Sequence, residues 1–268
     1  IVCGKVLFGL LVVLTVVFPI YMIVSNSFKP TLLIRKMPPQ FFFPLTLQHY
    51  VKILKQGNFL SYFGNSFIIA MSTTVISIVL GSLAAYGLAI MKSNWGNRIS
   101  TFLLFSKLVP TITIMIPLYI ILDKVHLLGT YVGPILAHVS VNAPFVAWLV
   151  LGFIRDIPGD LFEAGKLDGC TRMQVFWKIV FPLLSPAIGS ALLLVMQYSW
   201  NELLFSMQYT NLHTYTLTVG VSRFVGAISV DWGQSSAAAT IVMVPIIIAG
   251  FFLQKYLVSG LTAGAVKG

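Results

Sequence analysis

The sequence contains six long apolar runs, at residues 6–28, 67–91, 99–122, 131–154, 183–207 and 237–258. A helix needs about 20 residues to cross about 30 Å of hydrocarbon, so each run is long enough to span a bilayer. Three runs carry no charged residue, and the other three carry one each. Backbone groups in lipid must be paired internally, and the runs lack the alternation of a membrane β-barrel. We therefore predict an all-α membrane protein with six transmembrane helices in a single domain.

The composition supports this class and excludes several others. Hydrophobic residues make up 57% of the 268 residues and charged residues only 9%, whereas an average soluble domain is roughly 25% charged. An ordinary cytosolic enzyme, a disordered protein and a disulfide scaffold are therefore excluded. Basic residues that flank membrane helices explain the net charge of +10. No nucleic-acid-binding motif accompanies that charge.

Six spans place both termini on the same side of the membrane. If that side is the cytoplasm, nine Lys and Arg residues lie in cytoplasmic segments and seven lie outside. Basic residues favour cytoplasmic loops, so this difference weakly favours cytoplasmic termini.

The segment 155–182, between the fourth and fifth runs, is rich in acidic residues. Four of the seven Asp and Glu residues fall within residues 156–168. Pro158 suits the first turn of a helix. Asp160 and Glu163 have the spacing of an N-terminal capping pair. We therefore expect a short helix here, in water between two membrane spans.

A second short helix is expected after a turn. The first helix should end at Asp168-Gly169, a turn dipeptide. Thr171 and Gln174 form a capping box that opens a helix with Phe176 and Ile179 on one face. Such an amphipathic pair suits docking on a soluble partner, and a solvated loop without a partner is equally compatible with it.

The residues of this loop also form a recognisable pattern. They read Glu163-Ala164-Gly165, then Asp168-Gly169-Cys170, and later Phe181-Pro182. The pattern resembles the EAA loop of binding-protein-dependent ABC importer permeases, with Gly165 and Cys170 where alanine is usual. Both replacements are small, although Gly165 weakens a helix by roughly 1 kcal/mol relative to alanine.

Motifs along the rest of the chain resemble the carbohydrate branch of the same family. They lie at residues 18–30, 65–66, 117–119, 144–145, 152–153, 200–205 and 260–268. The last is similar to the C-terminal tail of maltose-type inner subunits, which contacts the ATPase interface; an inert terminus is the alternative here. The resemblance implies the type I ABC importer permease fold in a bacterial or archaeal cytoplasmic membrane.

The resemblance also implies a function and a set of partners. The chain would form half of the translocation path for a sugar, an oligosaccharide or a related carbohydrate. Its partners would be a second permease subunit, two cytoplasmic ATPase subunits, an extracytoplasmic solute-binding protein and the lipid bilayer. The ATPases would bind ATP and Mg²⁺, and this chain would need no cofactor or metal. The residues that would couple it to the ATPase are Glu163, Ala164, Gly165, Asp168 and Gly169, which places both termini in the cytoplasm.

Polar side chains inside the runs are candidates for lining a sugar path, because polar groups at membrane depth usually face the bundle interior or a wet cavity. Gln197, Asn201, Glu202 and Asn142 offer donors and acceptors for sugar hydroxyls. Hydrogen bonding to neighbouring helices is the alternative role for these four residues.

Two other functions compete with an ABC permease. A secondary, ion-coupled transporter usually shows internal repeats and paired intramembrane charges. Lys107 and Glu202 are expected about 12 Å and about 28 Å along their runs, at different depths, so we do not expect them to pair. His138 is expected to be structural. A membrane enzyme is disfavoured, because the chain has no Walker A, H-E-x-x-H or G-x-S-x-G motif.

Overall fold

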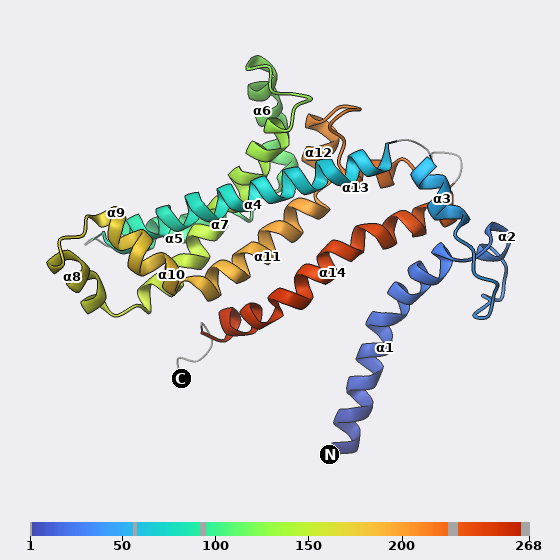
Figure 1. The fold of residues 1–268 in the computed structure, drawn as a ribbon, viewed down its shortest axis with the longest axis horizontal. Coiled ribbons are helices and arrows are strands. Elements are labelled where there is room, and N and C mark those ends of the chain that lie inside the picture. The colour runs from blue at the N-terminus through green and yellow to red at the C-terminus, as the bar shows by residue number, and fades with distance from the viewer. Residues whose placement is uncertain (1, 56–57, 92–94, 225–229, 264–268) are drawn as a thin grey trace. The chain divides into compact units, whose positions relative to one another are not determined.

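The computed structural model describes residues 2–55, 58–91, 95–224 and 230–263. These residues form helices joined by turns and loops, so the predicted all-α class is confirmed (Figure 1). They group into two compact units, one of residues 1–63 and 217–247 and the other of residues 64–216 and 248–268. Residues 264–268, the end of the expected C-terminal tail, lie outside the described residues.

The first unit includes the first long helix, the segments that follow it, and the start of the last long helix. It contains α1 (Val2–Ser27), α2 (Thr31–Ile34), α3 (Gln48–Lys55), α13 (Leu217–Ser222) and the first parts of α4 (Phe59–Ala89) and α14 (Trp232–Ala263). The ring of buried His49 lies with Nε2 2.9 Å from the Lys29 carbonyl oxygen. Gly233 packs against that ring, where a Cβ atom would collide with it. Arg35 donates a hydrogen bond of 3.0 Å to the Val230 carbonyl oxygen.

The second unit holds the remaining elements. They are α5 (Trp95–Ser106), α6 (Thr111–Lys124), α7 (Val132–Arg155), α8 (Gly159–Leu167), α9 (Arg172–Val175), the π-helix η1 (Phe176–Val180), α10 (Phe181–Leu183), α11 (Ser185–Asn201) and α12 (Leu204–Tyr209). Its core joins α4, α7, η1 and α11 through buried side chains such as Val146, Phe176 and Ala191. Gly81 allows α4 to approach α7 closely, because a Cβ there would lie 2.6 Å from the Val146 Cβ. Helices α8 and α9 lie towards one end of α7, and α6 and α12 lie towards the other (Figure 1).

The expected span at 99–122 is bent, and a second bend lies where the loop 155–182 meets the expected fifth span. Among the described residues, α1, α4, α7 and α14 are each long and apolar enough to cross a membrane. Helices α5 and α6 meet at 93°, and the segment Arg172–Leu183 meets α11 at 78°; six spans result if each bent pair counts as one. Pro110 accounts for the first bend, because proline lacks an N–H donor and disfavours a helical conformation in the residue before it.

Candidate functional site

The loop 155–182 begins with helix α8, which differs from the expectation at its first residue. Pro158, with φ −55° and ψ 133°, is the N-cap and provides no side-chain cap. Asp160 lies within the first turn, so the predicted capping pair of Asp160 and Glu163 is wrong. The Asp160 carboxylate still interacts favourably with the positive end of the helix dipole.

The end of α8 agrees with the sequence pattern. Helix α8 ends at Leu167, and Asp168 is its C-cap. Gly169 follows with φ +78°, a left-handed conformation that costs a residue with a Cβ roughly 1–2 kcal/mol. Glycine therefore allows the chain to reverse between α8 and α9 without strain.

The capping box that opens α9 is confirmed. The Thr171 N–H donates to Gln174 Oε1 at 2.7 Å, and the Gln174 N–H donates to Thr171 Oγ1 at 3.3 Å. The helix changes to π-helical geometry at Phe176. Phe176 is fully buried and Ile179 is half-buried, so both still contribute to the packing of the loop.

Close packing joins α8 to the segment that leads into the fifth span. A Cβ at Gly165 would lie 2.7 Å from Ile179 Cδ1 and 3.1 Å from Val175 Cγ2. Alanine, the usual residue at this position of the EAA pattern, would require Ile179 to move. Glycine at position 165 therefore brings α8 closer to α9 and η1 than alanine would.

The other residues expected to contact an ATPase lie on the surface of α8 or just after it. Among these residues, Glu163, Ala164 and Asp168 are exposed, whereas Gly165 is buried. Leu167 is 88% exposed, and it was not singled out from the sequence. Its apolar character within an acidic loop is the signal that could have identified it.

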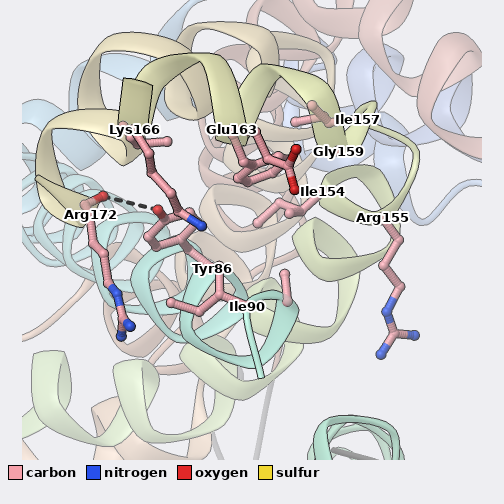
Figure 2. Close-up of a pocket in the computed structure, with 12 residues that line it drawn as sticks. Tyr86, Ile90, Ile154, Arg155, Ile157, Gly159, Glu163, Lys166 and Arg172 are labelled. Atoms are coloured by element: carbon pink, nitrogen blue, oxygen red, sulfur yellow. Dashed lines mark hydrogen bonds between the residues drawn. The ribbon is translucent and has the colours of Figure 1, made fainter. Parts of the chain in front are cut away.

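A cavity of about 580 Å³ lies between α8 and the ends of α4 and α7 (Figure 2). Its walls include Ile90, Ile154, Phe162 and Val175, and its polar lining groups are Tyr86, Arg155, Glu163, Lys166 and Arg172. The Tyr86 hydroxyl donates to the Arg172 carbonyl oxygen at 3.0 Å and so connects α4 to the start of α9.

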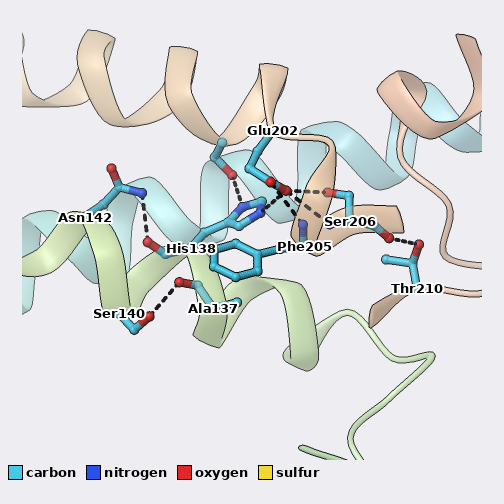
Figure 3. A network of polar contacts seen from close by, with 9 residues as sticks. Ala137, His138, Ser140, Asn142, Glu202, Phe205, Ser206 and Thr210 are labelled. Carbon is cyan, nitrogen blue, oxygen red and sulfur yellow. Dashed lines mark hydrogen bonds and ion pairs between the residues drawn. The ribbon is translucent and has the colours of Figure 1, made fainter. Parts of the chain in front are cut away.

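A second polar site lies where α7 passes the break between α11 and α12 (Figure 3). Glu202 adopts an extended conformation with φ −69° and ψ 129°. Its carboxylate accepts bonds of 3.0 Å from the N–H groups of Phe205 and Ser206. It also lies 3.1 Å from His138 Nε2, and His138 Nδ1 lies 2.6 Å from Ser199 Oγ.

In this arrangement the Glu202 carboxylate acts as a cap for helix α12 and as a hydrogen-bond partner of His138. A helix begins with backbone N–H groups that have no partner in the helix. The Glu202 side chain pairs two of them at the start of α12, in a region where unpaired groups are costly. Sequence reasoning identified Glu202 but could not find its partner His138, which lies 64 residues away.

Lys107 contacts Asn142 and the ring of Tyr198. Its Nζ atom donates to Asn142 Oδ1 at 3.1 Å and lies 4.5 Å from the centre of the Tyr198 ring. Asn142 is buried and donates to the His138 carbonyl oxygen at 2.7 Å. The Glu202 carboxylate contacts His138, whereas Lys107 bonds to Asn142.

Gln197 and Asn201 lie on the exposed side of α11. Both line a hollow of about 370 Å³ together with Leu194, Tyr198 and Glu202. The Asn201 amide donates to the Gln197 carbonyl oxygen one turn earlier, at 2.9 Å. The structure therefore brings Gln197, Asn201 and Glu202 to one hollow, whereas Asn142 is buried beside Lys107.

The comparison with known families identifies this arrangement of helices and loop. Residues 77–263 match the model of the binding-protein-dependent transport system inner membrane components. The chain belongs to this family. It is a multi-pass membrane protein and a permease subunit of an ABC importer, a transport protein rather than an enzyme. Nothing in the comparisons favours the ion-coupled alternative.

Sequence relatives and solved structures agree with this assignment. The chain is 33% identical over 266 residues to the trehalose/maltose transport system permease protein MalG of Thermococcus litoralis, covering 97% of this chain and 95% of that one. It is 34% identical over 263 residues to the trehalose transport system permease protein SugB of Mycobacterium tuberculosis, covering 96% and 95%.

The structural likeness extends over nearly the whole chain. A bacterial ABC transporter that imports the acidic polysaccharide alginate has a chain with a TM-score of 0.80, 21% identity and 95% coverage of both chains. A chain of the MetNI methionine transporter has a TM-score of 0.57, 17% identity, and coverage of 79% of this chain and 97% of that one. The predicted type I importer permease fold is therefore confirmed.

Proposed function

We propose that this permease forms half of the translocation path for a carbohydrate. A second permease would complete the path, and a solute-binding protein would deliver the carbohydrate from outside. The names of the relatives support a sugar or an oligosaccharide, since trehalose, maltose and arabinooligosaccharides are among their substrates. Gln197 and Asn201 provide exposed amide groups beside a hollow, and such groups can donate to and accept from sugar hydroxyls. Glu202 lines the same hollow and would add an acceptor to the path, and Asn142 would contribute through Lys107, to which it bonds.

The loop 155–182 would dock on one of two cytoplasmic ATPase subunits, which bind ATP and Mg²⁺. The observation that carries this proposal is the division of α8 into two faces. Gly165 is buried against Val175 and Ile179, while Ala164 and Leu167 are exposed. Glu163, Asp168 and Gly169 would complete the contact. This orientation places the termini in the cytoplasm.

The same two faces explain how ATP hydrolysis would move the membrane spans. When two ATPases close, each would displace the helix docked on it, and the close contact at Gly165 would pass that displacement to η1 and α11. The spans would then change between inward-open and outward-open states as rigid bodies, driven by partner contacts that differ between the states.

Replacing Ala164 by arginine tests this docking. The longer, charged side chain should block the contact, so that the ATPase no longer co-purifies with the permease and ATP-dependent uptake is lost. The amount of permease in the membrane should not change, since Ala164 is exposed. The matched control is Leu212→Arg, at a residue that is 59% exposed in the loop after α12.

Normal ATPase co-purification and uptake with Ala164→Arg would contradict the docking proposal. The carbohydrate proposal is tested separately, by uptake of radiolabelled trehalose, maltose and neutral oligosaccharides into cells that express the complete importer. ATP-dependent uptake of none of these, with uptake of another solute class, would reject it.

A further inference from the structure

We infer that the cavity between α8 and the ends of α4 and α7 binds a phosphate group of an anionic ligand. Its volume of about 580 Å³ lies within the usual range of small-molecule sites, about 300–1,000 Å³. The lining combines apolar walls with a few polar side chains, as is typical of such sites.

The charges that line the cavity define the chemistry of the ligand. Three basic side chains, Arg155, Lys166 and Arg172, accompany one carboxylate, Glu163. Figure 2 shows Arg155 and Arg172 on opposite sides of the lining, with Lys166 and Glu163 extending from α8 between them. The Arg155 guanidinium already donates to Asn97 Oδ1, so Lys166 and Arg172 against Glu163 leave an excess of one positive charge. That excess favours an anion, and the arginine side chain matches the oxygen geometry of phosphate.

The rest of the lining indicates that the phosphate is attached to an apolar group. Ile90, Ile154, Phe162 and Val175 supply apolar walls. At the end of α4, Ile90 is 37% exposed and the following Met91 is 43% exposed. Basic pockets between membrane helices on the cytoplasmic side bind anionic lipid headgroups. A phospholipid of the cytoplasmic leaflet and a soluble phosphate ester both have the required phosphate chemistry.

The cavity overlaps only at Glu163 with the surface that would meet the ATPase. Ala164 and Leu167 do not line it, whereas Phe162, Glu163 and Lys166 do. A bound ligand would therefore contact α8, α9 and the ends of two spans while the ATPase contacts the exposed face. It would stiffen the link between the coupling loop and the spans. The inference rests on the proposed function only for the cytoplasmic location of the loop.

Binding to the purified importer complex tests the inference. The complex is placed in nanodiscs of phosphatidylcholine alone or with phosphatidylglycerol, and the lipid that stays bound is measured by native mass spectrometry. Glycerol 3-phosphate and inorganic phosphate are added separately to the phosphatidylcholine sample. The test variant combines Lys166→Gln and Arg172→Gln, and the control combines Arg98→Gln and Lys178→Gln, which remove the same charge outside the cavity lining.

We expect phosphatidylglycerol or a soluble phosphate ester to bind the wild type in preference to phosphatidylcholine. Each basic residue contributes about a factor of five, so the test variant should bind about 30-fold more weakly and the control as the wild type does. Retention of phosphatidylglycerol assigns the phosphate to a lipid, and binding of glycerol 3-phosphate or phosphate alone assigns it to a soluble ligand.

Equal binding by the wild type and the test variant, or no preference for phosphate anions in the wild type, would overturn the inference. If the test variant cannot be purified, the lipid preference of the wild type and the single variant Lys166→Gln decide in the same way. Normal ATPase docking of the Ala164→Arg variant, together with ligand binding that the test variant loses, would reject the proposed docking and leave this inference standing.

Discussion

Replacing Glu202 by alanine should destabilise the second unit strongly, because the carboxylate has several buried partners. It accepts the N–H groups of Phe205 and Ser206 at 3.0 Å each and lies 3.1 Å from His138 Nε2. Glu202 is only 8% exposed and His138 is fully buried. Alanine removes the acceptor for all three groups.

The expected loss of stability follows from these contacts. Loss of a helix cap costs about 0.5–2 kcal/mol, and a buried hydrogen-bonding group left without its partner costs about 1–3 kcal/mol. The effects share one side chain and do not add fully, so we expect about 2–4 kcal/mol for Glu202→Ala. Glu202→Gln keeps a carbonyl acceptor for α12 and should cost about half as much.

The free energy of unfolding is measured by titrating the purified permease, in a mild detergent, with sodium dodecyl sulfate while following helix content. Asn201→Ala is the matched control, because Asn201 is exposed and its amide bonds to its own helix at Gln197. It should change stability by less than about 0.5 kcal/mol. A Glu202→Ala variant as stable as the Asn201→Ala variant would refute the capping and pairing assigned to this carboxylate.

Three further changes test the loop 155–182. Gly169→Val should cost roughly 1–2 kcal/mol, because φ is +78° there, and uptake should fall more than with Gly169→Asn; equal uptake would contradict this. Gly165→Leu should push α8 away from Ile179 and lower the free energy of unfolding by about 1–3 kcal/mol. It should also reduce ATPase co-purification more than Gly165→Ala does, and equal co-purification of the two variants would contradict this. Thr171→Ala removes half of the capping box with Gln174 and should lower thermal stability by about 1 kcal/mol; an unchanged melting curve would reject that role.

Much of the fold could be predicted because single segments determine it locally. The apolar runs predict the long helices, and the Thr171–Gln174 spacing predicts the capping box that the structure contains. Asp160 and Glu163 have an equally good spacing, yet Pro158 is the N-cap of α8. Spacing alone does not decide which residue leaves the helical conformation first.

The polar contacts at membrane depth could not be predicted, because they depend on how distant segments meet. Lys107 and Asn142 are 35 residues apart, and His138 and Glu202 are 64 apart. Counting residues along a run assumes a straight helix, and the 93° bend between α5 and α6 removes the basis for depths estimated in that way.

The continuity of α11 has a mechanical consequence. Its 17 residues end at Asn201, directly before Glu202, so it is a rigid rod about 25 Å long. A tilt of about 10° at the loop end would displace the far end by about 4 Å, simply from the length of the rod. The Glu202 carboxylate is hydrogen-bonded to both α7 and α12. That movement would therefore displace both helices beside the hollow that Gln197 and Asn201 line.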